Sequence, residues 1–169
     1  NKAVAQIAVW ELKEHDFRHI HTTGSIEKND FAVLAKQLGI NADPRFQIRE
    51  YLDDMPAMLA AADLVISRAG ALTLAEISAV GRAAVLIPSP NVAENHQYYN
   101  AMQLENLGAA RVLEEKKLTD GALVKLVDEM TRDKASLMEM GAKARALAQP
   151  DSLQKIWTHL EHLLKTGKP

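Results

Sequence analysis

The apolar positions of the chain follow two spacings that alternate along its length. Short runs rich in β-branched or aromatic residues predict strands, and apolar residues that recur every three or four positions predict helices. The predicted strands lie at residues 17–22, 46–52, 64–67, 83–87 and 110–114. The predicted helices lie at residues 2–13, 30–38, 55–62, 72–80, 96–107, 120–132, 134–148 and 152–165. This alternation predicts an α/β fold, with βαβ units in a Rossmann-like, doubly wound parallel sheet.

Residues near the ends of these segments predict how the helices are capped and which way the strands face. Asp53 or Asp54 is the expected N-cap of the helix at 55–62, and Thr119 is the expected N-cap of the helix at 120–132. The alternation along the strand at 46–52 directs three side chains inward: Phe46, Ile48 and Tyr51.

The order of the first elements predicts a break in the sheet. In a sheet of strand order 3-2-1-4-5-6 the first strand is central. The chain begins instead with the helix that should follow that strand, at residues 2–13. The five predicted strands would therefore leave a gap in mid-sheet, and we expect a strand and its Gly-rich turn upstream of Asn1.

Composition narrows the class of protein. A length of 169 residues suits one domain, and 47% apolar with 25% charged residues is ordinary for a globular chain. A net charge of −2 argues against nucleic acid as the main partner. There is no cysteine, and the six histidines have no metal-ligand spacing, so we expect no metal site. No apolar run reaches the length of a membrane span.

The stretch from Ala62 to Gly81 carries the strongest local signal for a binding site. Its apolar run at 64–67 predicts a strand buried on both faces, which is followed by a tight turn of small residues and then by a helix. Strand, glycine turn and helix together aim unpaired backbone N–H groups at an anion. Glu76 lies about one turn into the helix and leans toward its N-terminus, where it could bind sugar hydroxyls beside a phosphate. A glutamate near a helix start is also often only a complement to the helix dipole.

Four ordered motifs carry a resemblance to a known family. They are the Thr23-Gly24 turn, the run from Tyr51 to Met55, the run from Ser67 to Thr73 together with Glu76, and the run from Asn95 to Gln97. With these motifs the chain resembles the C-terminal, donor-binding domain of the MurG family, the N-acetylglucosaminyltransferases that make lipid II for peptidoglycan. The likeness extends over nearly the whole chain.

The resemblance implies a GT-B fold, with two Rossmann-like halves and an active site between them. Residues 1–149 would be the donor-binding domain, and residues 150–169 a final helix that crosses back to an N-terminal half. The donor would be UDP-N-acetylglucosamine and the acceptor lipid I, with inversion at the sugar and no cofactor. The enzyme would be peripheral, on the cytoplasmic side of the bacterial membrane. The catalytic base would belong to the other half, so this chain alone should be inactive.

The resemblance also assigns roles to individual residues. The backbone of Leu52 would read the uracil edge, and Met55 would pack nearby. Arg68 would support the turn or approach the nucleotide. Glu76 would bind the two ribose hydroxyls. Backbone N–H groups of the turn and helix start would hold the diphosphate, at Gly70, Ala71, Leu72 and Thr73. The side chains of His96 and Gln97 would hold sugar hydroxyls. The family often has Gln-Gln at the last pair, so His96 departs from its pattern.

Other readings of the same residues remain open. A different UDP-sugar enzyme on this scaffold, such as a UDP-N-acetylglucosamine 2-epimerase, would need carboxylates for acid–base chemistry, and Glu94 is the only unassigned one near the site. A non-catalytic donor-binding subunit is a third possibility. An NAD-binding domain is distant, since no G-x-G-x-x-G motif is present.

The helix at 152–165 carries an apolar stripe that should be buried. Its members are Leu153, Ile156, Trp157, Leu160, Leu163 and Leu164. Burying such side chains stabilises by roughly 1.5–3 kcal/mol each. In the family this helix packs on the N-terminal half. For this chain we expect it to pack on another copy, giving self-association, or to fold against its own domain.

Overall fold

The computed structural model describes residues 1–119 and 121–167. Its strands are β1 (His19–Thr22), β2 (Phe46–Arg49), β3 (Leu64–Ser67), β4 (Ala83–Leu86) and β5 (Arg111–Val112). Its α-helices are α1 (Lys2–Glu14), α2 (Gly24–Leu38), α3 (Met55–Ala61), α4 (Ala71–Val80), α5 (His96–Asn106), α6 (Ala122–Thr131), α7 (Lys134–Ala146) and α8 (Ser152–Thr166). Short 3-10 turns are η1 (Ile40–Ala42), η2 (Ala93–Asn95) and η3 (Glu115–Lys117). The α/β class is confirmed.

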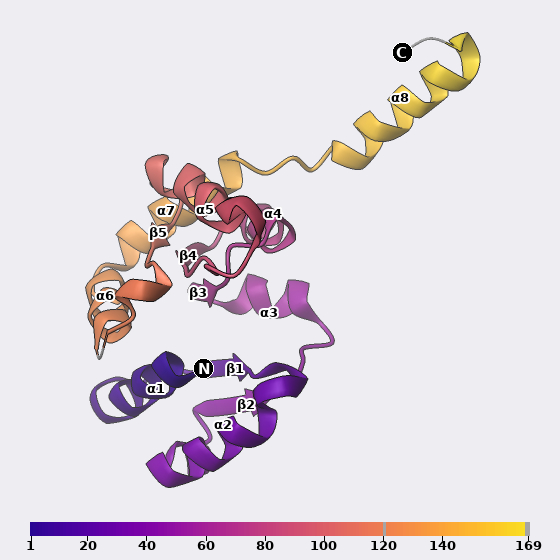
Figure 1. Cartoon of the computed structure of the whole chain (residues 1–169). Helices are drawn as coiled ribbons and strands as arrows, with labels where there is room; N and C mark the ends of the chain where they lie inside the picture. The colour runs from indigo at the N-terminus through magenta and orange to yellow at the C-terminus, as the bar shows by residue number, and fades with distance from the viewer. Residues whose placement is uncertain (120, 168–169) are drawn as a thin grey trace.

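The strands form two parallel sheets and not one. β1 pairs with β2, and β3, β4 and β5 form a second sheet in that order, with β4 in the middle. In Figure 1 the two sheets lie in separate parts of the molecule, with β1 and β2 in the lower part and β3, β4 and β5 above them. Among the described residues no strand joins β1 to β3, which is the position of the gap that the sequence predicts. That a strand upstream of Asn1 fills it remains a prediction.

The gap explains why β3 is less buried than expected. All four of its residues, Leu64 to Ser67, are only half-buried, whereas all four residues of β4 are buried. β3 has a strand neighbour on one side only, while β4 has neighbours on both sides. The sequence prediction that β3 is buried on both faces is therefore wrong for this chain.

Helices cover both faces of β4, as a doubly wound sheet requires. Leu86 packs on one face in a cluster with Ile77 of α4. Val85 packs on the other face in a cluster that includes Ile7 of α1. On the opposite side of α1, Ala8 belongs to the core of the first sheet. α1 therefore joins the two sheets through their hydrophobic cores.

Two local predictions need correction. Tyr51 is 65% exposed and its hydroxyl bonds to Ser25, because β2 ends at Arg49 and the alternation stops there. The N-cap of α6 is Gly121 and not Thr119, whose backbone oxygen accepts the N–H of Ala122. Residue 120 lies outside the described residues. By contrast, Asp54 is confirmed as the N-cap of α3, because its side chain accepts the N–H of Ala57.

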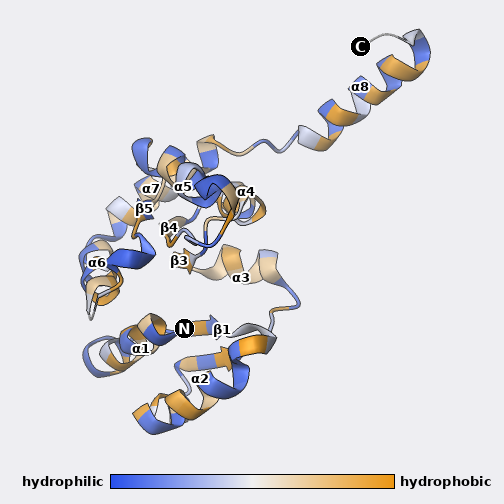
Figure 2. Ribbon diagram, in the orientation of Figure 1, coloured by the Kyte–Doolittle hydropathy of each residue, from blue (hydrophilic) through white to orange (hydrophobic). Residues whose placement is uncertain are grey.

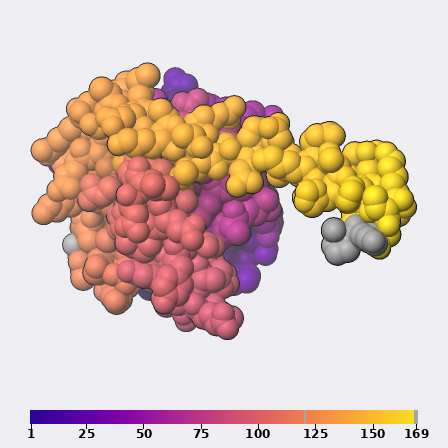
Figure 3. Space-filling view, turned by 90° about the horizontal axis from the view of Figure 1, so that it is seen from above, coloured from indigo at the N-terminus to yellow at the C-terminus, as the bar shows by residue number. Residues whose placement is uncertain are grey.

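α8 stands apart from the rest of the chain. It follows an extended connector and projects away from the other elements (Figures 1 and 3). Its apolar stripe alternates with polar residues along the ribbon in Figure 2. All six stripe residues are exposed, from 41% at Leu163 to 86% at Leu164. The expectation that α8 folds against its own domain is therefore wrong. No helix within the described ranges is long and apolar enough to cross a membrane.

Candidate functional site

Pairing of β3 with β4 brings two helix starts to one edge of the sheet. Ser67, the last residue of β3, lies opposite Leu86, the last residue of β4. The backbone N–H of Ile87 donates to the backbone oxygen of Ser67 at 2.8 Å, so the segments that follow β3 and β4 leave the sheet side by side. α4 and α5 begin after these turns and contact one another. The carboxyl edge of parallel strands is where open α/β sheets bind ligands.

The turn between β3 and α4 presents unpaired backbone donors. Gly70 is the N-cap of α4 and provides no side-chain hydrogen bond to the helix start. The first helical bond runs from the N–H of Leu74 to the oxygen of Gly70, at 3.0 Å. The N–H groups of Ala71, Leu72 and Thr73 therefore have no intrahelical acceptor. Leu72 is 75% exposed, which leaves this helix start open to solvent.

Gly70 is not required by the fold itself. Its φ of −68° and ψ of 143° suit any residue. An added Cβ would meet only the hydroxyl of Thr73, at an ordinary 3.8 Å. Gly141 differs, because a Cβ there would clash with the backbone oxygen of Gly81. The bare backbone at Gly70 thus leaves space at the helix start that no protein atom occupies.

Glu76 supplies the carboxylate of this site. It lies on α4 and is half-buried. Among the residues that the structure describes, it has no hydrogen-bond or ion-pair partner. Side chains on a helix lean toward its N-terminus, so the carboxylate of Glu76 is directed to the same end as the free N–H groups. A phosphate on the amides and a hydroxyl on Glu76 can therefore belong to one ligand.

Arg68 lies along the carboxyl edge of the second sheet. Its guanidinium donates to the backbone oxygen of Ile87, at 3.3 Å, and forms an ion pair with Glu115 of η3. The side chain therefore crosses from the end of β3, past the end of β4, to the turn after β5. These contacts hold the guanidinium of Arg68 at the ends of β4 and β5.

The start of α5 holds the predicted sugar-binding pair. Gln97 is half-buried, and its side-chain oxygen accepts the backbone N–H of Ser89 at 2.9 Å. This bond leaves the amide NH₂ of Gln97 as the group that can donate to a ligand. His96 is exposed, with Nδ1 2.9 Å from the oxygen of Ala93. Gln97 is therefore fixed in position, and His96 lies outward beside it.

The remaining two predicted residues lie near the first sheet. Leu52 follows β2 and is half-buried, and Met55 begins α3 with 36% of its surface exposed. α3, which begins at Met55, packs against α4, the helix that carries Glu76. The structure gives no direct contact between them and the turn.

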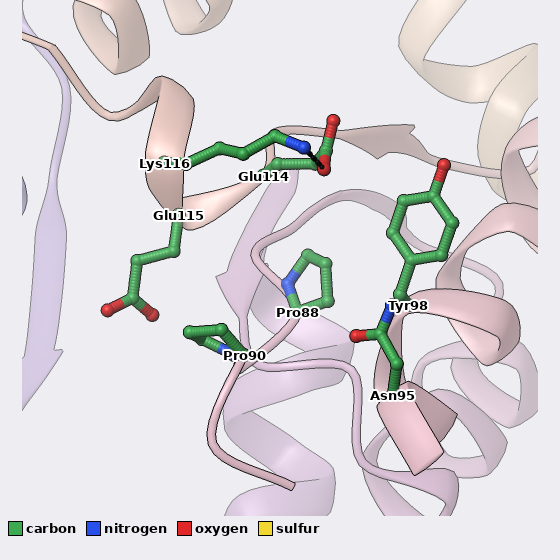
Figure 4. A pocket seen from close by; sticks show the side chains of 7 residues that line it. All are labelled: Pro88, Pro90, Asn95, Tyr98, Glu114, Glu115 and Lys116. Atoms are coloured by element: carbon green, nitrogen blue, oxygen red, sulfur yellow. Dashed lines mark ion pairs between the residues drawn. The ribbon is translucent and has the colours of Figure 1, made fainter.

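A cavity of about 320 Å³ lies next to these residues, at the ends of β4 and β5. Figure 4 shows its lining: Pro88, Pro90, Asn95, Tyr98, Glu114, Glu115 and Lys116. The sequence predicts none of these residues as part of a site. They come from the segment between β4 and the first turn of α5 and from the segment after β5, and these two segments are distant in sequence. The cavity adjoins the predicted site through Glu115, which binds Arg68.

The described residues, 1–119 with 121–167, contain no cluster of three or more His, Cys, Asp or Glu side chains that could hold a metal ion. Lys116 and Lys117 compensate the negative charge of Glu114. Each lysine contacts one carboxylate oxygen of Glu114, at 2.8 Å. These contacts hold the pKa of Glu114 below its usual value.

The comparison with protein families identifies this fold. The profile described as "Glycosyltransferase family 28 C-terminal domain" matches residues 1–156. The chain belongs to this family. The glycosyltransferase family 28 match includes every predicted site residue and ends within α8.

Curated relatives agree with this family and carry one shared name. A UDP-N-acetylglucosamine–N-acetylmuramyl-(pentapeptide) pyrophosphoryl-undecaprenol N-acetylglucosamine transferase of Bacillus licheniformis is 37% identical over 158 residues, which is 94% of this chain and 43% of that protein. The protein of the same name from Oenococcus oeni is 38% identical, over 99% of this chain and 45% of its own length. The chain thus spans less than half the length of these relatives.

Solved structures match the fold. The crystal structure of Acinetobacter baumannii MurG superposes with a TM-score of 0.80 at 29% identity, over 95% of this chain and 46% of that one. The glycosyltransferase of kitacinnamycin, at 23% identity and a TM-score of 0.64, shows the fold alone. The resemblance to the MurG family that the sequence motifs carry is therefore confirmed.

Proposed function

We propose that this chain binds UDP-N-acetylglucosamine and serves as the donor half of an enzyme that transfers N-acetylglucosamine to lipid I. The observation that carries the proposal is the start of α4. Its open amides at Ala71, Leu72 and Thr73 and the unpartnered carboxylate of Glu76 lie on one short helix. A diphosphate next to a ribose is a ligand that uses both groups. The relatives' shared name supplies the donor and the lipid-linked acceptor.

The same geometry favours the chemistry of transfer. When the acceptor hydroxyl displaces UDP at the anomeric carbon, negative charge builds on the departing diphosphate. Fixed N–H groups at a helix start stabilise that charge without reorganising. We assign no catalytic base to this chain. The base and the acceptor groove are proposed to belong to the half of the relatives' length that this chain does not span, so the chain alone is expected to transfer nothing.

The acceptor also bears on location and assembly. An undecaprenol-linked acceptor lies in a membrane, and we propose that the enzyme works as a peripheral protein on the cytoplasmic side. Residues 150–169 are proposed to be a separate C-terminal segment, distinct from the donor-binding domain at 1–149. For this chain in isolation we propose that the apolar stripe of α8 pairs with that of a second copy, because six exposed apolar side chains favour burial.

Titration calorimetry tests donor binding directly. UDP and UDP-N-acetylglucosamine are expected to bind the chain in a one-to-one ratio, and ADP is expected to bind at least about tenfold more weakly. Uridine, which lacks the diphosphate, is expected to bind more weakly than UDP, because it cannot use the α4 amides. Equal affinity for ADP and UDP, or no binding of either uridine nucleotide, would contradict the proposal.

A further inference from the structure

The ion pair between Arg68 and Glu115 joins the candidate diphosphate turn to a carboxylate. Arg68 comes two residues before the N-cap Gly70, and Glu115 begins η3 after β5. The Arg68 side chain is 53% exposed and that of Glu115 is 38% exposed. Both groups are therefore accessible to solvent. Ion pairs at this exposure are weak and are readily exchanged for another partner.

Glu115 differs from its neighbour in how its charge is compensated. Glu114 is bound by two lysines, Lys116 and Lys117. Within the described part of the chain, Arg68 is the cation bound to Glu115. If Arg68 turns toward a bound phosphate, Glu115 loses its counter-charge and remains as a negative group beside a negative ligand.

We propose that Glu115 is a positioning residue. Its carboxylate holds Arg68 away from the nucleotide until a bound diphosphate becomes the ion-pair partner of Arg68 instead. This inference rests on the proposed donor binding and adds a residue that the sequence motifs do not include. In the free protein the carboxylate of Glu115 forms an ion pair with the guanidinium of Arg68. In the bound protein Arg68 contacts phosphate, and the uncompensated charge of Glu115 weakens binding and assists release of the nucleotide product.

The test compares Glu115→Gln with Glu114→Gln by UDP calorimetry at low salt. Glu115→Gln keeps a side-chain oxygen that can accept a hydrogen bond from Arg68, but it removes the negative charge. Glu115→Gln is expected to bind UDP about 3- to 10-fold more tightly than the wild-type chain, and about 0.5 M salt is expected to abolish most of the gain. Glu114→Gln removes the same charge one residue away and is expected to change the affinity less than about twofold, because Glu114 pairs with Lys116 and Lys117 and not with Arg68.

Two further measurements separate this role from a structural one. Uridine affinity is expected to be equal in wild type and Glu115→Gln, because uridine has no phosphate. In an Arg68→Gln background, Glu115→Gln is expected to give no gain, because the exchanged cation is gone. An unchanged or weaker UDP affinity, the same gain for uridine, or a persistent gain without Arg68 would overturn the inference. If the wild-type chain fails to bind UDP at all, the proposed function fails and this inference fails with it.

Discussion

Gln97 accepts the backbone N–H of Ser89 through its side-chain oxygen, at 2.9 Å, and so connects the start of α5 to the loop after β4. The bond has two consequences for a bound sugar. It fixes the amide plane of Gln97, and it leaves the NH₂ group to donate to sugar hydroxyls. We therefore expect Gln97 to select for the sugar and not for the nucleotide.

Gln97→Ala is expected to weaken binding of UDP-N-acetylglucosamine by about 1–1.5 kcal/mol, the usual contribution of a hydrogen bond, and to leave UDP affinity nearly unchanged. Gln97→Glu is the control, because it keeps an oxygen for Ser89 and loses the donor. Calorimetry with both ligands measures the difference. Equal losses for UDP and its sugar derivative would show that Gln97 serves only to shape the loop.

Glu76→Ala is expected to weaken UDP binding by about 1.5–3 kcal/mol, because charge-assisted hydrogen bonds to the ribose hydroxyls are lost. Calorimetry with UDP measures this loss. A UDP analogue without the two ribose hydroxyls provides the control, since wild type and variant should bind it equally. An unchanged UDP affinity in Glu76→Ala would remove Glu76 from the site.

Gly70→Ala is expected to leave the free energy of unfolding within about 0.5 kcal/mol of wild type, because the backbone angles and the 3.8 Å contact accept a Cβ. UDP affinity is expected to fall about tenfold or more, since the methyl group enters the space beside the open amides. Gly141→Ala is the contrasting variant, because its Cβ would clash with Gly81 and reduce stability. Urea unfolding and calorimetry on both variants separate folding from binding. Full UDP affinity in Gly70→Ala would show that no ligand approaches this backbone.

His21 predicts how stability depends on pH. Burial against Phe31 and Phe46, and then the nearby charge of His19, lower the pKa of His21 from 6.5 to about 4. The unfolded chain therefore binds more protons than the folded chain between these values. The stabilising effect of a neutral His21 is fully present above pH 6.5 and is lost as the pH falls toward 4, by at most about 3 kcal/mol.

Urea unfolding at pH 7, 5.5 and 4 measures this loss. His21→Phe keeps an aromatic ring in the same packing and removes the titrating group, so its stability is expected to fall less over this range. A parallel fall in wild type and variant would assign the acid sensitivity to other groups.

Removal of α8 tests its proposed self-association. Light scattering is expected to show a mass above that of one chain for the full sequence at high concentration, and a single-chain mass after truncation at Gln149. Leu160→Ser is expected to act in the same direction, and His159→Ser, on the neighbouring position, is expected not to. A monomeric full chain that also shows no dye binding would contradict the argument from the stripe.

Sequence reasoning succeeded where a residue's role depends on its near neighbours. The strand, turn and helix from Leu64 to Val80 follow from periodicity and from the glycines at 70 and 81, and all three form as predicted. Tyr51 shows the limit, because the strand ends at Arg49 and Tyr51 lies beyond it, exposed to solvent. Partners separated by many residues gave no signal. The pair of Arg68 and Glu115 spans 47 positions and becomes visible only once β3, β4 and β5 lie side by side.

The break between β1 and β3 has a consequence for how the chain behaves among other molecules. Each of these strands has one edge whose backbone donors and acceptors face no other described strand. Such edges act as templates for an added extended segment. An apolar β-peptide added separately is therefore expected to pair with one of these edges.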